Sequence, residues 1–113
     1  IDGIQPLRWD ERASKHSFYL YIMRYDPAAF AGVPRSRFVE ALVAEGVPAF
    51  TGYTFPVYAN PMFLNKNFHG KGCPLTCGHY GRDVDYAAFA QQCPVTERAC
   101  YQESIWLEHR RHR

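Results

Sequence analysis

Residues 17–25 read Ser-Phe-Tyr-Leu-Tyr-Ile-Met-Arg-Tyr, and they form the strongest strand pattern in the chain. Successive side chains of a strand point to opposite faces. One face would carry Phe18, Leu20, Ile22 and Arg24, and the other Tyr19, Tyr21, Met23 and Tyr25. Because both sets are largely apolar or aromatic, the pattern predicts a central strand that is covered on both faces. Asp26-Pro27 ends the strand, since proline offers no N–H to a sheet.

A helix is predicted directly after this strand. Pro34 stands near the first turn of the helix, where its missing N–H costs nothing. Apolar side chains then recur at helical spacing. The stripe consists of Phe38, Ala41, Leu42 and Glu45, with Val39 and Val43 beside it. Gly46 is suited to the left-handed conformation that closes a helix, and residues 47–50 predict a second short strand.

Two segments show no regular period. Residues 1–15 are polar and irregular, so they predict an entry segment rather than a helix or strand. Residues 51–80 are rich in Gly, Pro, Asn and aromatic side chains. A stretch of that length without regular structure is typical of an interface or a lid.

Two helices and a strand are predicted near the end of the chain. Residues 83–92 predict a short helix with Asp83 as its N-cap. Pro94 begins a second helix, which runs to about Glu103. Residues 104–107 predict a last strand.

This order of elements predicts an α/β layer arrangement. We expect a small α+β-type domain, in which a short sheet of three to four strands packs with about three helices. The sheet is expected to be mainly antiparallel, because only the first helix lies between strands at the spacing of a parallel crossover. At 113 residues the chain has room for a single domain.

The composition excludes some classes of function. Hydrophobic residues make up 47% and charged residues 21%, as in globular domains. No apolar run reaches the roughly 18 residues that a membrane-spanning helix needs. The formal net charge is +2, and three arginines lie in the last four residues, so no clustered basic face remains for nucleic acid. We therefore expect neither nucleic acid nor a membrane as a partner. The start at Ile1, without a signal-peptide pattern, predicts a piece of a longer protein.

The four cysteines allow three interpretations. Cys73 and Cys77, with His79 and either His69 or Cys93, offer ligands for zinc, although a structural zinc site usually has two closely spaced pairs. Two disulfides in a secreted domain are the second interpretation. Reduced thiols in a cytosolic protein are the third and the one that we expect, so no metal site is predicted.

The sequence contains no complete catalytic motif. It has no glycine-rich phosphate loop after a strand, no HExxH and no EF-hand. Lys15, Lys66 and Lys71 lie among polar residues, whereas a Schiff-base lysine needs a desolvated or cation-crowded pocket. We therefore expect no catalytic residue in this chain.

The loop at residues 52–58, Gly-Tyr-Thr-Phe-Pro-Val-Tyr, has two tyrosines on either side of a proline. Their hydroxyls are placed to donate hydrogen bonds to a ligand while their rings form a wall. The alternative is that the rings pack the loop onto the sheet.

Several pieces of the sequence follow one another as in a known family. They are the aromatic strand at 17–25, the G-x-x-R helix start at Gly32 and Arg35 with Gly46, the G-Y-x-x-P-V-Y loop at 52–58, and the CPVTE helix at 93–97 followed by IWL at 105–107. In this order they resemble the C-terminal domain of the DegT/DnrJ/StrS sugar aminotransferases. These enzymes depend on pyridoxal phosphate (PLP) and have the aspartate-aminotransferase fold. The resemblance extends from Ile4 to His109.

The resemblance implies a function for the intact protein rather than for this chain alone. Such enzymes transfer an amino group from glutamate or glutamine to a keto sugar nucleotide or a related cyclitol. A lysine of their large N-terminal domain holds PLP as a Schiff base, so no cofactor-binding residue is expected here. The implied partners are that large domain and a second subunit, in a cytoplasmic homodimer. By the same resemblance Tyr53 and Tyr58 are candidate substrate contacts, with His69 as a further one.

Some features depart from the family pattern. Glu108 stands where the family favours a proline, and the chain ends in HRRHR where a further helix is expected, which leaves the packing of the last strand open. The segment 66–82 is an elaboration of only one branch of such enzymes. The alternative hypotheses are a stand-alone zinc-stabilised module and a binding module that uses the aromatic loop.

Overall fold

The computed structural model describes residues 1–67, 79 and 82–108. The chain divides into two compact units. We call Ile1–Thr54 together with Arg98–Arg113 the sheet unit, and Phe55–Glu97 the insert unit.

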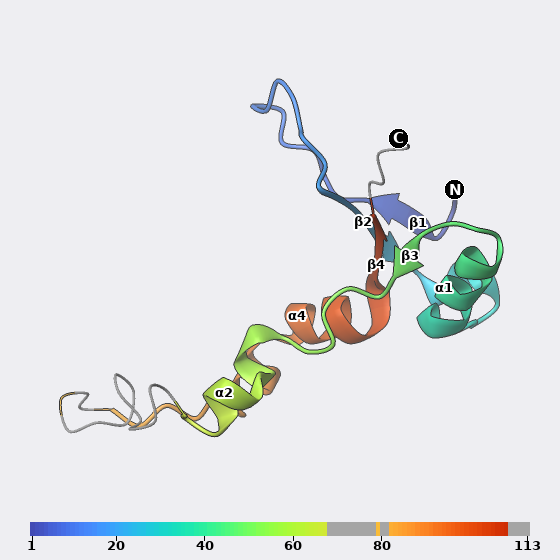
Figure 1. Ribbon diagram of the computed structural model, residues 1–113. Coiled ribbons are helices and arrows are strands. Elements are labelled where there is room, and N and C mark those ends of the chain that lie inside the picture. The colour runs from blue at the N-terminus through green and yellow to red at the C-terminus, as the bar shows by residue number, and fades with distance from the viewer. Residues whose placement is uncertain (68–78, 80–81, 109–113) are drawn as a thin grey trace. The chain divides into compact units, whose positions relative to one another are not determined.

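The sheet unit contains a four-stranded antiparallel sheet in the order β1-β2-β4-β3 (Figure 1). Its strands are β1 (Ile4–Pro6), β2 (Leu20–Tyr25), β3 (Ala49–Phe50) and β4 (Ser104–Glu108). The predicted fold class is therefore confirmed. The segment 17–25 supplies a central strand, as expected, although the strand begins at Leu20. The packing of the last strand is also settled, because β4 pairs with both β2 and β3.

One face of the sheet carries the hydrophobic core. Tyr25 and Ile105 are completely buried, and Val39 and Ala49 complete the cluster of buried residues. Val39 comes from α1 (Arg35–Ala44), and two neighbours on that helix, Phe38 and Leu42, pack against the cluster. The Tyr25 hydroxyl donates a hydrogen bond of 2.8 Å to the Val33 carbonyl oxygen, so the one polar atom of this ring is satisfied.

The opposite face of the sheet carries apolar side chains beside the polar Arg24 and Ser104, and it is less covered. Ile22 lies opposite Trp106 in the register, and Phe50 lies opposite Trp106 on the other side. Ile22 and Trp106 are half-buried, while Phe50 is 38% exposed. None of these three side chains belongs to the core cluster or packs against it. The predicted coverage is thus partial on both faces, because Tyr21, on the same face as the buried Tyr25, is 36% exposed.

Helix α1 matches its predicted bounds, but the predicted stripe is only partly right, because Val39 is the buried residue while Ala41 and Glu45 are exposed. The helix follows Pro34, and Gly46 after its end has φ of +83°, as the predicted closing glycine requires. The prediction for residues 1–15 is wrong at one point, because Ile4–Pro6 forms β1 at the edge of the sheet. Three residues that include a proline show no alternation, and an edge strand tolerates a proline because it needs few donors.

The insert unit consists of short helices. They are a 3₁₀ helix at Val57–Ala59, α2 at Pro61–Leu64, α3 at Phe89–Gln92 and the start of α4 at Pro94–Arg98. The prediction that residues 51–80 lack regular structure is therefore wrong for Val57–Ala59 and Pro61–Leu64, where the Asn60 side chain accepts a hydrogen bond from the Met62 N–H and caps α2. In the sheet unit, a 3₁₀ helix spans Pro27–Phe30, and a π-helix at Ala99–Glu103 joins α4 to β4.

The predicted N-cap at Asp83 is wrong. Asp83 instead forms an ion pair with Lys66. Asp85 caps the turn that leads into α3, since its Oδ1 accepts hydrogen bonds from the N–H groups of Ala87 and Ala88 at 3.0 and 3.4 Å. The N-cap residue of α3 itself is Ala88, which makes no side-chain capping bond. Across the part of the chain that the structure describes, no helix has the length and apolar character needed to cross a bilayer.

Candidate functional site

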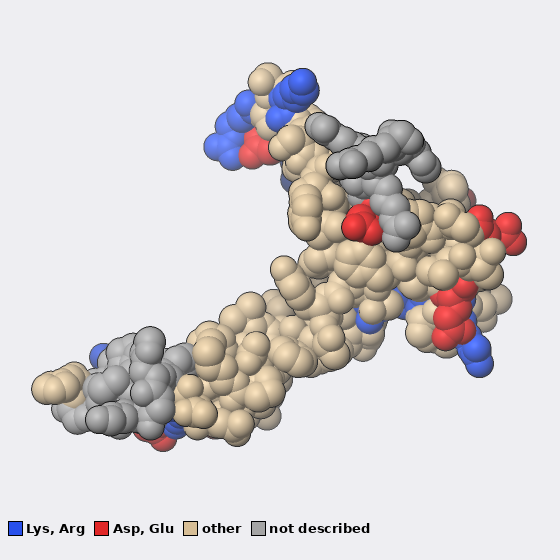
Figure 2. Space-filling view, viewed as in Figure 1, with Lys and Arg blue, Asp and Glu red and all other residues tan. Residues whose placement is uncertain are grey.

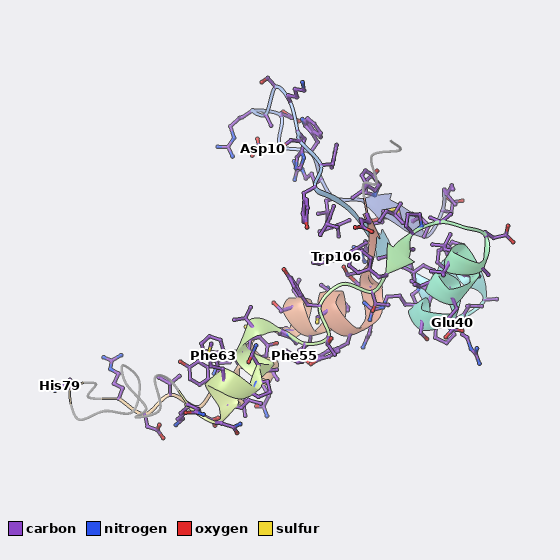
Figure 3. The ribbon with its side chains drawn as sticks, viewed as in Figure 1. Asp10, Glu40, Phe55, Phe63, His79 and Trp106 are labelled. Atoms are coloured by element: carbon purple, nitrogen blue, oxygen red, sulfur yellow. The ribbon has the colours of Figure 1, made fainter. Side chains whose placement is uncertain are left out.

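Tyr53 lies in the loop that follows β3, and its side chain is 75% exposed. Its ring meets the indole of Trp106 edge-on, with the ring centroids 5.0 Å apart and an interplanar angle of 78°. Trp106 of β4, labelled in Figure 3, lies on the less covered face of the sheet. The Phe50 ring of β3 contacts it there, with the ring centroids 5.7 Å apart. The three rings form an aromatic surface with the Tyr53 side chain as its most exposed member.

The backbone next to Tyr53 is shaped to fit Trp106. Gly52 has φ of +81°, and a Cβ atom at this position would lie 2.6 Å from Cε2 of Trp106. Only glycine meets both conditions without strain. The Cys100 thiol contacts the loop from the π-helix and donates a hydrogen bond of 3.4 Å to the Tyr53 carbonyl oxygen. The loop is therefore supported both at its backbone and at its ring.

Arg35, at the start of α1, binds four backbone carbonyl oxygens. Its Nη1 donates to Cys100 and Ser104 at 2.9 Å each and to Thr51 at 3.3 Å, and its Nη2 donates to Tyr101 at 2.9 Å. Burial lowers the pKa of the guanidinium, while Cys100 acts in the opposite direction. No carboxylate among the described residues pairs with it. Sequence reasoning singled out Arg35 only as part of a motif and missed this contact set.

Tyr58 lies in the insert unit, and its hydroxyl is already engaged. It donates a hydrogen bond of 2.5 Å to Oε1 of Glu97. Its ring lies 6.1 Å from that of Phe89, within a chain of rings that continues through Tyr86 to Phe63. Within the described insert unit this aromatic chain takes the place of a buried core. The role of Tyr58 as a substrate contact stays a prediction.

The other predicted ligand residues lie mainly outside the described part of the chain. This holds for His69 and for Cys73 and Cys77 of the zinc hypothesis. Among residues 1–67, 79 and 82–108, no three His, Cys, Asp or Glu side chains gather closely enough to hold a metal ion. Cys93 is a free, half-buried thiol.

The two lysines that the structure describes are not in a pocket suited to a Schiff base. Lys15 is exposed, and Lys66 pairs with the carboxylate of Asp83. The hydrogen bond from Lys66 and its charge lower the pKa of the Asp83 carboxyl, which favours the carboxylate form of Asp83.

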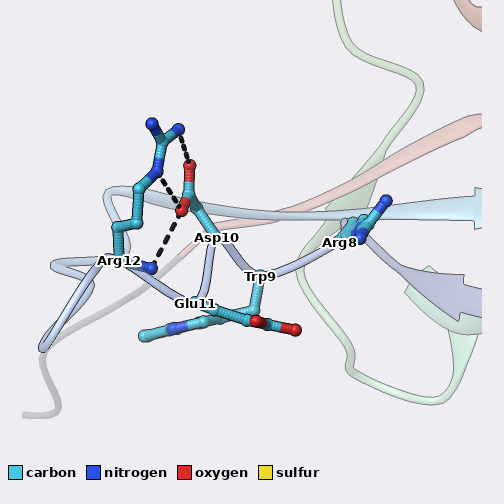
Figure 4. A pocket seen from close by; sticks show the side chains of 5 residues that line it. All are labelled: Arg8, Trp9, Asp10, Glu11 and Arg12. Atoms are coloured by element: carbon cyan, nitrogen blue, oxygen red, sulfur yellow. Dashed lines mark hydrogen bonds and ion pairs between the residues drawn. The ribbon is translucent and has the colours of Figure 1, made fainter.

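A shallow hollow lies in the segment between β1 and β2. Five consecutive residues line it: Arg8, Trp9, Asp10, Glu11 and Arg12 (Figure 4). Arg12 and Asp10 neutralise each other through an ion pair of 2.6 Å, and the hydrogen bond from Arg12 lowers the pKa of Asp10. Figure 2 shows charged side chains gathered on this segment, whereas most of the visible surface elsewhere is uncharged. Because its lining comes from one exposed segment, the hollow brings no distant groups together.

The contacts of Tyr53 distinguish it from the other predicted site residues. It presents a ring and a hydroxyl on a supported loop, next to two further aromatic side chains. Such a surface suits the C–H groups of a cyclic ligand on the rings and a ligand oxygen on the hydroxyl.

Comparison with curated proteins shows similarity along almost the whole chain. A protein from Streptoalloteichus tenebrarius is 37% identical over 112 residues, which is 96% of this chain and 26% of that protein. One from Micromonospora echinospora is 34% identical, covering 96% of this chain and 25% of that protein. Both carry the provisional name L-glutamine:3-amino-2,3-dideoxy-scyllo-inosose aminotransferase.

The chain is similar to part of an aminotransferase. A 3-amino-5-hydroxybenzoate synthase from Amycolatopsis mediterranei is a more distant relative, 29% identical over 97% of this chain. This chain spans about a quarter of the length of the curated relatives that it matches. No protein-family model matches it.

Proposed function

We propose that this chain is the C-terminal, substrate-side domain of a PLP-dependent aminotransferase of the DegT/DnrJ/StrS type. The observation that carries the proposal is the similarity along 96% of the chain to three proteins named as cyclitol aminotransferases. Their printed names give L-glutamine as the amino donor and an amino-dideoxy-scyllo-inosose as the acceptor. For the intact protein we propose glutamine or glutamate as the donor and a keto cyclitol, rather than a keto sugar nucleotide, as the acceptor.

PLP itself does not fit the residues described here. A PLP site needs a lysine whose amine is desolvated or crowded by other cations. Lys15 is exposed and Lys66 is paired with Asp83, so neither meets this need. In the proposed enzyme, the groups that hold PLP belong to the large N-terminal domain, and the intact protein is a cytoplasmic homodimer. We assign no chemical step to this chain.

The proposed role of this chain is to hold the amino acceptor. Tyr53 supplies a donor hydroxyl and an exposed ring, supported by Trp106. A cyclitol has both hydroxyl groups and C–H groups, so it matches a surface of this chemistry. Tyr58 and His69 are retained as further candidate contacts, although the Tyr58 hydroxyl must then leave or share Glu97.

The less covered face of the sheet is the proposed contact surface for the large domain. Antiparallel sheets that face water on one side carry polar residues there. Here that face carries Ile22, Phe50 and Trp106 in addition to the polar Arg24 and Ser104. Apolar side chains at these positions are stabilised when a second domain covers them.

The function is tested on the longer protein that contains this chain. The purified protein is expected to show the absorbance of a PLP Schiff base and to convert glutamine and a keto cyclitol into an aminocyclitol. Borohydride reduction should attach PLP to one lysine outside residues 1–113. Labelling of one specific lysine within residues 1–113, or the absence of PLP from active protein, would contradict the proposal. A keto sugar nucleotide is assayed as the competing acceptor, and we expect the enzyme to convert the keto cyclitol in preference to it.

A further inference from the structure

The Arg35 side chain joins its own helix, α1, to two stretches of the chain that are far from it in the sequence. Its four acceptors are the carbonyl oxygens of Thr51 in the loop after β3, of Cys100 and Tyr101 in the π-helix, and of Ser104 at the start of β4. The last carbonyls of a helix have no partner within the helix, and a cation there is favourable. Capping accounts for the contacts with the π-helix, but it does not account for the contact with Thr51.

The same segments hold Tyr53. Thr51 is two residues before Tyr53, and Cys100 donates its thiol hydrogen bond to the Tyr53 carbonyl oxygen. Ser104 precedes Trp106 by two residues, and its hydroxyl accepts a hydrogen bond from the Trp106 indole N–H. Tyr53 is thus supported by its own loop backbone, by the Cys100 thiol and by the Trp106 ring. Each of these supports lies no more than two residues from a carbonyl group that Arg35 binds.

The contact set needs the shape of arginine. The guanidinium is planar and presents its N–H groups in a rigid fork, so one side chain binds several carbonyls in fixed directions. The ammonium group of a lysine keeps the charge but cannot reach carbonyls on separate segments in the same geometry. Arg37, two residues further along the chain, contrasts with Arg35 because it is exposed and pairs with Glu40 on its own helix.

We propose that Arg35 is a positioning residue that sets the place of the Tyr53 side chain for ligand contact. The inference rests on the proposed function for the nature of the ligand, but the positioning itself does not depend on it. Arg35 acts only through the backbone of Thr51, Cys100 and Ser104 and does not itself touch the ligand.

Arg35→Lys in the longer protein tests the proposal, with Arg37→Lys as the matched control. Both variants keep the net charge and the helix propensity of α1. A loss of hydrogen bonds worth about 1 kcal/mol corresponds to a KM for the amino acceptor that rises about 5- to 10-fold in Arg35→Lys, with kcat little changed. Arg37→Lys is expected to match the wild type in both constants.

A spectroscopic measurement separates this proposal from the proposed function. In the 113-residue chain bearing Trp9→Phe, Trp106 is the only tryptophan, so its near-ultraviolet circular dichroism reports its contact with Tyr53. Arg35→Lys is expected to weaken this signal while the far-ultraviolet spectrum is retained. An unchanged signal and an unchanged KM in Arg35→Lys would overturn the proposal. If neither the wild type nor any variant transfers amino groups, the proposed function is wrong. The circular dichroism of Trp106 then still tests whether Arg35 positions Tyr53.

A second variant covers the case in which Arg35→Lys does not fold. Cys100→Ala removes the thiol contact with Tyr53 but keeps the Cys100 carbonyl that Arg35 binds. The Trp106 signal and the KM are expected to change in the same direction as for Arg35→Lys, by a smaller factor. Wild-type values for both in folded Cys100→Ala would contradict the proposed support of Tyr53.

Discussion

Gly52 and Trp106 fit so closely that a methyl group at Gly52 would lie 2.6 Å from the indole. Gly52→Ala is therefore expected to lower the free energy of unfolding by about 2–4 kcal/mol, the sum of left-handed backbone strain and overpacking. Gly32 is the control, because its φ of +77° is similar but nothing lies within 4 Å of the position of a Cβ. Gly32→Ala should cost only the backbone term of about 1–2 kcal/mol. Urea unfolding measures both, and equal losses would contradict a close fit.

The buried phenol of Tyr25 makes stability depend on alkaline pH. Burial, and then the charge of Asp26, raise the pKa of Tyr25 above its ordinary value. Since the folded pKa exceeds the unfolded one, the contribution is complete below about pH 10 and is lost as the pH rises through the folded pKa. Tyr25→Phe should lose about 1 kcal/mol at pH 7, because the Val33 carbonyl loses its donor. The deficit of the variant should shrink in urea titrations above pH 10, and a constant deficit would contradict the raised pKa.

The two aspartates before α3 should differ in their effect on the turn that leads into this helix. Asp85→Ala removes the acceptor of the Ala87 and Ala88 N–H groups, so their amide hydrogen exchange should accelerate roughly 3- to 10-fold, for a cap worth about 1 kcal/mol. Asp83→Ala should leave these two amides unchanged, since Asp83 pairs with Lys66 instead. Faster exchange of these amides in Asp83→Ala than in Asp85→Ala would instead support Asp83 as the capping residue, as predicted from the sequence.

The two tyrosines of the loop should affect different measurements. In the longer protein, Tyr53→Phe is expected to raise the KM for the amino acceptor about 3- to 10-fold, as loss of one hydrogen bond implies. Tyr58→Phe should instead lower the free energy of unfolding by about 1–2 kcal/mol, because Glu97 loses a donor. Tyr19→Phe, at an exposed position, controls for removal of a hydroxyl. A KM effect from Tyr58→Phe alone would reverse the assignment.

The apolar face of the sheet should matter more in the longer protein than in this chain. Phe50→Asp places a carboxylate on that face, whereas Val43→Asp places one on α1 at a position that is 53% exposed. If the large domain covers Phe50, Phe50→Asp should lower the stability of the longer protein by about 2 kcal/mol more than that of the 113-residue chain. Val43→Asp should have equal effects in the two. If Phe50→Asp lowers the stability of both proteins equally, the large domain does not cover this face.

The regular elements with clear periodicity could be predicted from the sequence, because their signals are local. The alternation around Ile22 and the punctuation by Pro34 and Gly46 gave a central strand and a helix that the structure confirms. β1 could not be predicted, because its short segment is ordered by pairing with β2 rather than by its own pattern. Likewise, Asp83 and Asp85 are equivalent as candidate caps in the sequence, and only the ion pair between Lys66 and Asp83 distinguishes them.

The site was only partly predictable for a related reason. Tyr53 stands out because an aromatic residue after a glycine in an irregular loop is a visible signal. The contacts of Arg35 leave no such signal, because its acceptors are backbone carbonyls, one of them 65 residues away. Backbone acceptors are available from every residue type, so no spacing or composition reveals them.

The antiparallel pairing of β3 with β4 has an evolutionary consequence. The two strands are neighbours although residues 55–97 separate them, so the chain leaves and re-enters the sheet unit at adjacent points. The entropy of closing such an excursion grows only with the logarithm of its length. Insertions and deletions between β3 and β4 therefore need not change the order or pairing of the strands in the sheet. Related proteins can differ in the length of this segment and still keep the same order of strands in the sheet.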